Sequence, residues 1–93
     1  MKNEIHKKVL SEYFEQILNG SKTFELRLAD WGINEGDILV LDEINSQTKK
    51  PTGRSIRKKA GYILKTKDLK LFSKEEVNQY GYQIISLLDE DTV

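Results

Sequence analysis

Apolar and polar positions recur along most of the chain with periods that predict short strands and helices. The run 4–10, EIHKKVL, is predicted to be a strand with Ile5 and Val9 on one face. Ser11 then stands where a helix N-cap belongs, and Gly20 where a left-handed C-terminal cap belongs. Between them, apolar pairs four residues apart predict one buried helical stripe, formed by Tyr13 with Ile17 and Phe14 with Leu18.

The next segment, 22–28, has a strict period of two, which predicts a strand. One face carries Phe24, Leu26 and Leu28, and the other carries Thr23, Glu25 and Arg27. Residues two apart on a strand project to the same side, roughly 6.5–7 Å apart. The charged heads of the polar row can therefore converge on one ligand, and Lys22 leads into that row.

Three further strands are predicted. Residues 37–44, DILVLDEI, lack alternation, as expected of a strand buried on both faces. Residues 54–65 form the second, and Gly61 marks a bulge in it. Residues 82–88 form the last. On the second of these strands one side is predicted to carry Ile56, Ala60, Tyr62 and Leu64.

A second, short helix is predicted just before the last strand. Ser73 and Glu76 have capping-box spacing, and Phe72 with Val77 fit a hydrophobic staple around the cap. Gly81 is expected to end this helix. The helix would separate the last two strands.

These elements predict an α+β fold with five or six strands and two flanking helices. Few connections are long enough for helical crossovers, so the sheet should be mixed or mostly antiparallel and curled into a small barrel. A length of 93 residues suits a single domain, 1–93. The acidic residues 89–93 are expected to form a frayed tail.

Composition excludes several kinds of functional site. The chain has no cysteine, which excludes a disulfide framework, a cysteine nucleophile and cysteine-based zinc sites. With His6 as the only histidine, no metal site and no cofactor is predicted. No apolar stretch approaches the roughly 20 residues of a membrane span, and no signal-peptide pattern is seen, so we expect a cytoplasmic protein without a membrane partner.

The formal net charge of zero hides one basic segment between residues 49 and 67. Its cations, with no acid among them, are Lys49, Lys50, Arg54, Arg57, Lys58, Lys59, Lys65 and Lys67. Such a segment can present a local anion-binding surface. The alternative is a solvated hairpin whose lysines only aid solubility.

The polar row also has two interpretations. A glutamate and an arginine together supply acceptor oxygens and a planar donor fork, which can read a base edge, while a lysine beside them suits a phosphate. Alternatively, Glu25 and Arg27 face water or form cross-strand ion pairs worth about 0.2–1 kcal/mol each.

The stretch GSKTFELR fits the pattern G-x-K-x-x-E-x-R, and in this the chain resembles the ASCH domains of the PUA-like superfamily. The segments around it, INEGDILVL, TGRSIRKKAGYIL and GYQIISL, are similar to successive strands of that family, so the resemblance spans about Ile5 to Leu88. It implies a PUA-like barrel with a cleft and a role with RNA or nucleotides. It implies that Gly20, Lys22, Glu25 and Arg27 line the cleft, and Asp30 matches the family's acidic residue after the strand.

We therefore expect an RNA- or nucleotide-binding domain. In this hypothesis Lys22 and Arg27 meet phosphates together with Arg54 and Arg57 of the basic segment, and Glu25 reads a base. Trp31 either stacks on a base beside the cleft or fills the edge of the core. We expect a monomer; a protein-interaction domain would need an exposed apolar patch, which the pattern does not predict, although Tyr80 and Tyr82 can contribute to one.

The alternative is an enzyme. Some small ASCH-type proteins resemble amidohydrolases that act on an acylated (N4-acetyl) cytidine through a lysine, a threonine and a glutamate. Here the catalytic set would be Lys22, Thr23 and Glu25. Lys22 matches the family lysine, but Thr23 stands two residues before the position of the family threonine, and a downstream glutamate has no clear counterpart.

Overall fold

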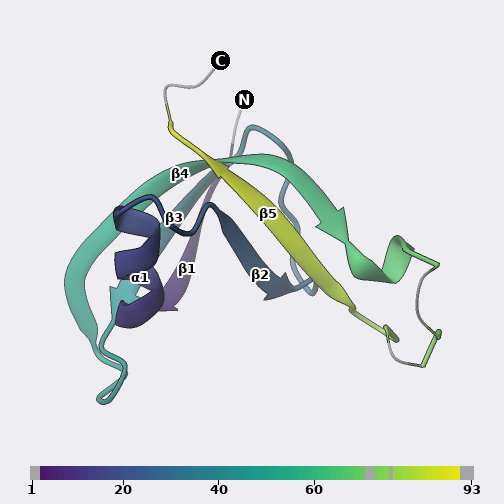
Figure 1. The fold of residues 1–93 in the computed structure, drawn as a ribbon, viewed down its shortest axis with the longest axis horizontal. Helices are drawn as coiled ribbons and strands as arrows, with labels where there is room; N and C mark the ends of the chain where they lie inside the picture. The colour runs from purple at the N-terminus through teal and green to yellow at the C-terminus, as the bar shows by residue number, and fades with distance from the viewer. Residues whose placement is uncertain (1–2, 71–72, 76, 91–93) are drawn as a thin grey trace.

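The computed structural model describes residues 3–70, 73–75 and 77–90. In this part of the chain, five strands form one curled mixed sheet and a single α-helix packs against its inner side (Figure 1). The elements are β1 (Glu4–Leu10), α1 (Ser11–Leu18), β2 (Phe24–Leu28), β3 (Ile38–Ile44), β4 (Pro51–Lys65), the 3-10 helix η1 (Thr66–Asp68) and β5 (Tyr82–Leu88). The α+β class and the mixed sheet are thus confirmed.

The strand order is β1-β3-β4-β5-β2, so the first two strands of the chain are the two edges of the sheet. Only β1 and β3 run parallel in this sheet; the other neighbours are antiparallel. The curl of the sheet brings its two edge strands together. Their proximity is seen in the hydrogen bond that Arg27 Nη2 on β2 donates to the Lys8 carbonyl on β1, at 2.7 Å. The result is a half-barrel with an open seam between β1 and β2.

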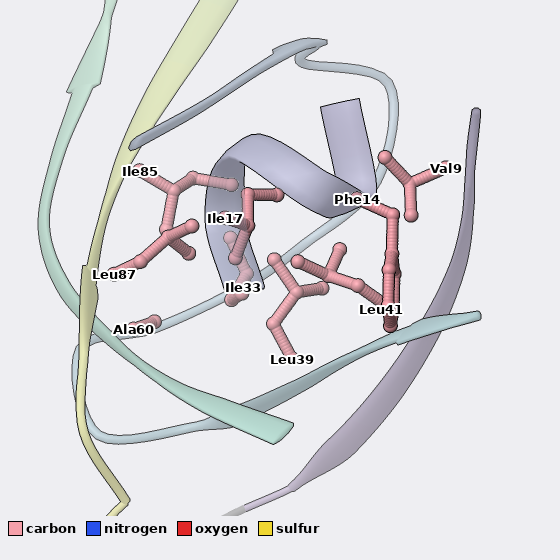
Figure 2. Close-up of a cluster of buried hydrophobic side chains, with 9 residues drawn as sticks. All are labelled: Val9, Phe14, Ile17, Ile33, Leu39, Leu41, Ala60, Ile85 and Leu87. Atoms are coloured by element: carbon pink, nitrogen blue, oxygen red, sulfur yellow. The ribbon is translucent and has the colours of Figure 1, made fainter. Parts of the chain in front are cut away.

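The core fills the inside of this half-barrel (Figure 2). Its buried members are Val9, Phe14, Ile17, Ile33, Leu39, Leu41, Ala60, Ile85 and Leu87. β3 has four consecutive buried residues, which confirms the prediction from its unbroken apolar run. The helix differs from prediction: Phe14 and Ile17, three residues apart, are buried, whereas Tyr13 and Leu18 are half-exposed.

The predicted cap at Ser11 is wrong. The N-cap residue is Leu10, and Ser11 is the first helical residue. Because β1 runs into α1 without a loop, the backbone stays extended up to Leu10. The Ser11 hydroxyl donates instead to the carbonyl of Ile44, the last residue of β3, at 3.1 Å.

A bulge in β4 changes which side chains face the core. The pairing with β5 shifts between Ala60 and Ile63, as Gly61 predicted. Ala60 is buried and Ile63 packs against the core, although they are an odd number of residues apart. An extra residue in one strand reverses the alternation. Tyr62 therefore points outward, and its predicted place on the face of Ala60 is wrong.

The second predicted helix does not form in the described residues. Around Ser73 and Val77 the chain makes turns, with Val77 N donating to the Ser73 carbonyl at 3.3 Å. Glu76 and Phe72, on which the capping box and staple depended, lie outside the described residues. A short helix is marginal unless an apolar face packs against the core. Positive φ angles at Gln79 and Gly81 also interrupt helical geometry before β5.

The acidic tail begins with two residues that make ion pairs. Asp89 contacts Lys58 at 3.2 Å and Glu90 contacts Arg57 at 3.0 Å. Residues 91–93 lie outside the described residues. Among the helices of the described chain, none is long and apolar enough to cross a membrane.

Candidate functional site

The charged row of β2 points into the half-barrel, and its apolar row points out. Glu25 is only 3 % exposed, whereas Phe24, Leu26 and Leu28 are 47 %, 55 % and 50 % exposed. This is the reverse of the usual arrangement, in which apolar residues face the core. The apolar patch that the sequence pattern did not predict is therefore present on the outer side of the sheet.

Glu25 is held between two cations. Its Oε1 accepts a hydrogen bond from Lys22 Nζ at 2.7 Å, and its Oε2 accepts one from Arg27 Nε at 2.8 Å. The two cationic side chains are themselves mostly covered. A buried carboxylate needs such partners, because an unpaired buried charge is very costly. Lys22, Glu25 and Arg27 are called the ionic triad below.

The turn after α1 places the first member of the ionic triad. Gly20 has φ +87°, a conformation that a side chain disfavours, and its N–H bonds to the Ile17 carbonyl at 3.2 Å. Lys22 N then donates to the Gln16 carbonyl at 2.9 Å, which folds the chain back beneath the helix end. From there Lys22 Nζ reaches both Glu25 and the Phe24 carbonyl, the latter at 2.8 Å.

A cleft of about 420 Å³ opens beside the ionic triad, at the seam between β1 and β2. It is lined by Lys8, Val9, Leu10, Tyr13, Lys22, Phe24, Glu25, Leu26 and Arg27. Its volume falls within the roughly 300–1,000 Å³ typical of small-molecule sites. The cleft combines an apolar wall, two half-exposed aromatic rings and three cations against one carboxylate.

Only part of the predicted site meets at this cleft. Lys22, Glu25 and Arg27 line it, and Gly20 shapes the turn leading to it. The lining does not include Thr23, whose carbonyl accepts a bond from Leu87 N at 2.9 Å, nor the exposed Asp30. Sequence patterns missed Lys8 and Tyr13, because they reach the cleft only when the curl brings β1 and α1 against β2.

Trp31 belongs to the edge of the core. It is partly buried and packs against the core cluster, and Lys7 Nζ lies 4.1 Å from the centroid of its ring. Of the two interpretations, the structure supports the core edge. Trp31 is not among the residues that line the cleft.

Arg54 is also committed to partners within the protein. Its Nε donates to Glu43 Oε1 at 2.7 Å and its Nη2 to Glu43 Oε2 at 2.9 Å, while Glu15 accepts a further bond from Nη2. Hydrogen bonds from Arg54, and next from Thr52, lower the pKa of Glu43 from 4.5 to about 2. Arg54 lines a separate cavity of about 260 Å³ rather than the cleft.

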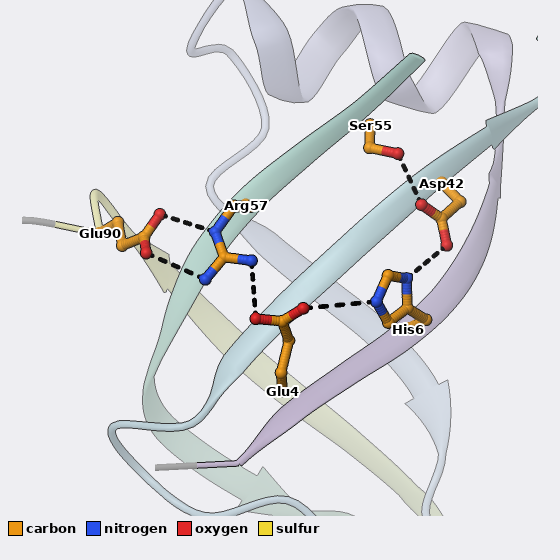
Figure 3. A network of polar contacts seen from close by, with 6 residues as sticks. All are labelled: Glu4, His6, Asp42, Ser55, Arg57 and Glu90. Carbon is orange, nitrogen blue, oxygen red and sulfur yellow. Dashed lines mark hydrogen bonds and ion pairs between the residues drawn. The ribbon is translucent and has the colours of Figure 1, made fainter. Parts of the chain in front are cut away.

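Arg57 lies on the outer side of the sheet, in a polar network that spans β1, β3 and β4 (Figure 3). It donates to Glu4 at 2.7 Å and to both oxygens of Glu90, at 3.0 and 3.1 Å. Neither Arg54 nor Arg57 is among the residues that line the cleft. Their charges are instead balanced by carboxylates from other parts of the chain.

His6 takes part in the same network. Its Nδ1 lies 2.8 Å from Asp42 Oδ2, and its Nε2 lies 3.5 Å from Glu4 Oε1. The hydrogen bond with Asp42 raises the pKa of His6 above its ordinary 6.5, and bonds from Ser55 and then His6 lower the pKa of Asp42. Ser55 donates to Asp42 rather than to the imidazole, so this trio lacks the nucleophile–base contact of a hydrolase triad.

The described residues contain no group of three or more histidine, aspartate or glutamate side chains that could hold a metal ion. Within that part of the chain, the seam offers a ligand charged side chains, aromatic rings and a concave surface.

In the residues that the structure describes, the fold and the cleft define a small β-rich domain with one α-helix and a charged seam. The family model described as "Domain of unknown function (DUF3850)" matches residues 5–85, and the chain belongs to this family. The match covers all five strands, apart from Glu4 at the start of β1 and residues 86–88 at the end of β5. No curated protein matches the chain.

Proposed function

We propose that the seam cleft binds a nucleotide or a short single-stranded stretch of RNA. The observation that carries this proposal is the ionic triad: a buried glutamate holding a lysine and an arginine side by side at the wall of an open cleft. The proposal includes a PUA-like, ASCH-type architecture for the half-barrel. The G-x-K-x-x-E-x-R residues and the curled sheet support that assignment.

The triad has a simpler explanation as protection of an edge strand. Inward-pointing charges are one way in which proteins keep an edge strand from pairing with another chain. That role needs neither two cations on one carboxylate nor a cavity beside them. Hydrophobic replacements for a buried ion pair are often neutral or stabilising, so stability alone does not require three charged groups here, and a binding role accounts for them.

The cations are available for an anion. Lys22 Nζ has three donors, and the bonds to Glu25 and the Phe24 carbonyl use two of them. Arg27 bonds through Nε and Nη2, so the fork of its guanidinium is only partly engaged by these contacts. Lys8 adds a third cation at the cleft. Glu25 then acts as a positioning residue that holds Lys22 and Arg27 for phosphate contacts, the kind that fix a nucleic acid in register.

Two aromatic side chains offer faces for a base. Tyr13 and Phe24 both line the cleft, and both are about half-exposed. Their ring centroids lie 5.8 and 5.0 Å from Lys22 Nζ, so a base and a phosphate bound there would be neighbours. Base stacking on an aromatic ring contributes about 1–3 kcal/mol and tolerates any base. We therefore propose a ligand of one or a few nucleotides, without strong sequence preference.

The experiment is an NMR titration of ¹⁵N-labelled protein with nucleoside monophosphates and short single-stranded RNA. We expect amide shifts confined to residues 8–13 and 22–27, weakened by salt as phosphate contacts require. Lys8→Gln, a cleft change outside the ionic triad, should weaken binding about tenfold, the effect of losing roughly 1.4 kcal/mol. The matched control is Lys50→Gln, an exposed loop lysine that does not line the cleft.

Absence of shifts in residues 8–13 and 22–27, or equal loss of binding in both lysine variants, would contradict the proposal. The same titration with N4-acetylcytidine tests the enzyme alternative, because hydrolysis would change the acetyl signal with time. We do not extend the proposal to hydrolysis, since Thr23 is not among the residues that line the cleft.

A further inference from the structure

The outer side of β2, of β5 up to Ser86 and of β4 from Tyr62 onward forms an uncharged apolar surface, called the outer face below. It consists of Phe24, Leu26, Leu28, Tyr62, Leu64, Tyr82, Ile84 and Ser86. Register places them together: Leu26 pairs with Ile84, Leu28 with Tyr82, and Leu64 with Ile84. All but Ser86 are apolar or aromatic, and none is charged, in a chain that is 32 % charged overall.

The outer face is exposed because the inner sides of the same strands are already occupied. Ile85 and Leu87 of β5 point into the core, and Glu25 points into the seam. The bulge in β4 turns Tyr62 outward, where it is 65 % exposed. The described chain has its one α-helix on the inner side of the sheet, so no helix covers the outer face (Figure 1).

The outer face exposes a substantial apolar area to solvent. Five of these side chains, Phe24, Leu26, Leu28, Tyr62 and Tyr82, are each about half-exposed or more. With roughly 150–250 Å² for a large side chain, they present on the order of 500 Å² of apolar surface. The largest apolar patch on a typical monomer is about 300–600 Å² and is often functional. A standard protein interface buries about 800 Å² per partner, and its core is about 65 % apolar.

We propose that the outer face is the contact surface of a homodimer, in which two copies of this chain pack their sheets face to face about a two-fold axis. The proposal is argued from the outer face, which shares Phe24 and Leu26 with the lining of the cleft, and it replaces the monomer that the sequence led us to expect. Its apolar area matches the core of a standard interface. Two uncharged faces bring no like charges into opposition, and a formal net charge of zero adds no repulsion between copies.

The contact is isologous, so each residue of the outer face meets the same surface on the second copy. Packed sheets lie about 10 Å apart, with their side chains interdigitated. Phe24 and Leu26 belong both to the outer face and to the lining of the cleft. The second copy therefore covers the outside of the strand whose inner side carries the ionic triad.

The test is sedimentation velocity of the full chain over about 1–300 µM, a range that spans micromolar dissociation constants. We expect a monomer–dimer equilibrium in this range. The double variant Leu28→Lys/Tyr82→Lys should raise the dissociation constant about 100-fold, since two half-exposed apolar residues of the outer face, each replaced by a charge, contribute roughly tenfold each. Both positions are on the surface and away from the cleft lining, so folding and the cleft are expected to be retained.

The matched control is Leu18→Lys. Leu18 has the same 50 % exposure as Leu28 but lies on α1, outside the outer face. It should leave the dissociation constant unchanged. A second readout is isotope-filtered NOEs between Leu28 methyl groups of a labelled copy and tyrosine rings of an unlabelled one. A monomer throughout the concentration range, or a dimer that survives the double variant, would overturn the proposal.

Discussion

Neutralising Glu25 should destabilise the domain far more than neutralising an exposed glutamate. In Glu25→Gln, the side chain keeps its shape but leaves Lys22 and Arg27 facing an uncharged amide. Breaking a fully buried ion pair costs about 3–5 kcal/mol. The two cations here are about one-fifth and one-quarter exposed, so water offsets part of the loss. We expect a decrease of about 2–3 kcal/mol in the free energy of unfolding.

That loss is a large fraction of the total. A domain of 93 residues is stable by roughly 5–14 kcal/mol, and 1 kcal/mol shifts the Tm of such a domain by about 4–8 °C. Trp31 is the single tryptophan and packs against the core, so its fluorescence follows unfolding in urea. The control is Glu35→Gln, at an exposed turn position, which should change stability by less than about 0.5 kcal/mol.

Removing all the charges together gives the sharper comparison. The variant Lys22→Met/Glu25→Leu/Arg27→Met leaves none of the three charges of the ionic triad without its partner. Apolar replacement of a whole buried ion network is often neutral or stabilising, so we expect a stability within about 1 kcal/mol of the wild type, with nucleotide binding abolished. If the triple variant were less stable than Glu25→Gln alone, or if Glu25→Gln were neutral, the reasoning about the ionic triad would be refuted.

Three further predictions follow from packing, backbone geometry and charge. Phe14→Ala removes a ring at the centre of the core and should cost about 3–5 kcal/mol in urea unfolding. Gly81→Ala places a methyl 2.9 Å from the backbone nitrogen of Lys67 at a φ of +61°, so a loss of about 2 kcal/mol or more is expected in the same assay. The hydrogen bond with Asp42 raises the pKa of His6 in the folded protein above 6.5. The stability that His6 contributes is therefore fully present below pH 6.5 and is lost as the pH rises through the folded-state pKa. His6→Gln should therefore destabilise at about pH 5.5 and have little effect at about pH 8.5, and an imidazole titration at or below the ordinary pKa would contradict this.

Local sequence patterns predicted most of the strands, because the period of apolar residues within a strand is a property of that strand's own sequence. The runs at 4–10 and 82–88 coincide with β1 and β5, and the unbroken apolar run gave the buried β3. The bulge was foreseen at Gly61, but its consequence for Tyr62 was not, because reversal of the faces depends on pairing with β5. The cap at Ser11 failed for a similar reason, since its hydroxyl bonds to a β3 residue distant in sequence.

The helix predicted before β5 shows the limit of capping signals. Ser73 and Glu76 have the right spacing, but among the described residues of this segment Val77 is only partly buried and Tyr80 is exposed, so no apolar face packs against the core. Helical stability in proteins comes mainly from packing of an amphipathic face, which α1 obtains from Phe14 and Ile17. A cap without such a face specifies a turn.

To predict the candidate site, one must know which side of β2 faces inward. The alternation of apolar and polar residues along β2 does not give this orientation. A period of two separates the charged row from the apolar row, but the sequence rule that apolar residues face the core assigns them to the wrong sides here. The two rows require each other. Burying Glu25 and Arg27 at the seam forces Phe24, Leu26 and Leu28 onto the surface, because adjacent residues of a strand point to opposite faces. If a second copy covers that apolar row, the cost of exposing it is recovered. The proposed anion-binding cleft and the proposed dimer surface are then two consequences of the same strand orientation.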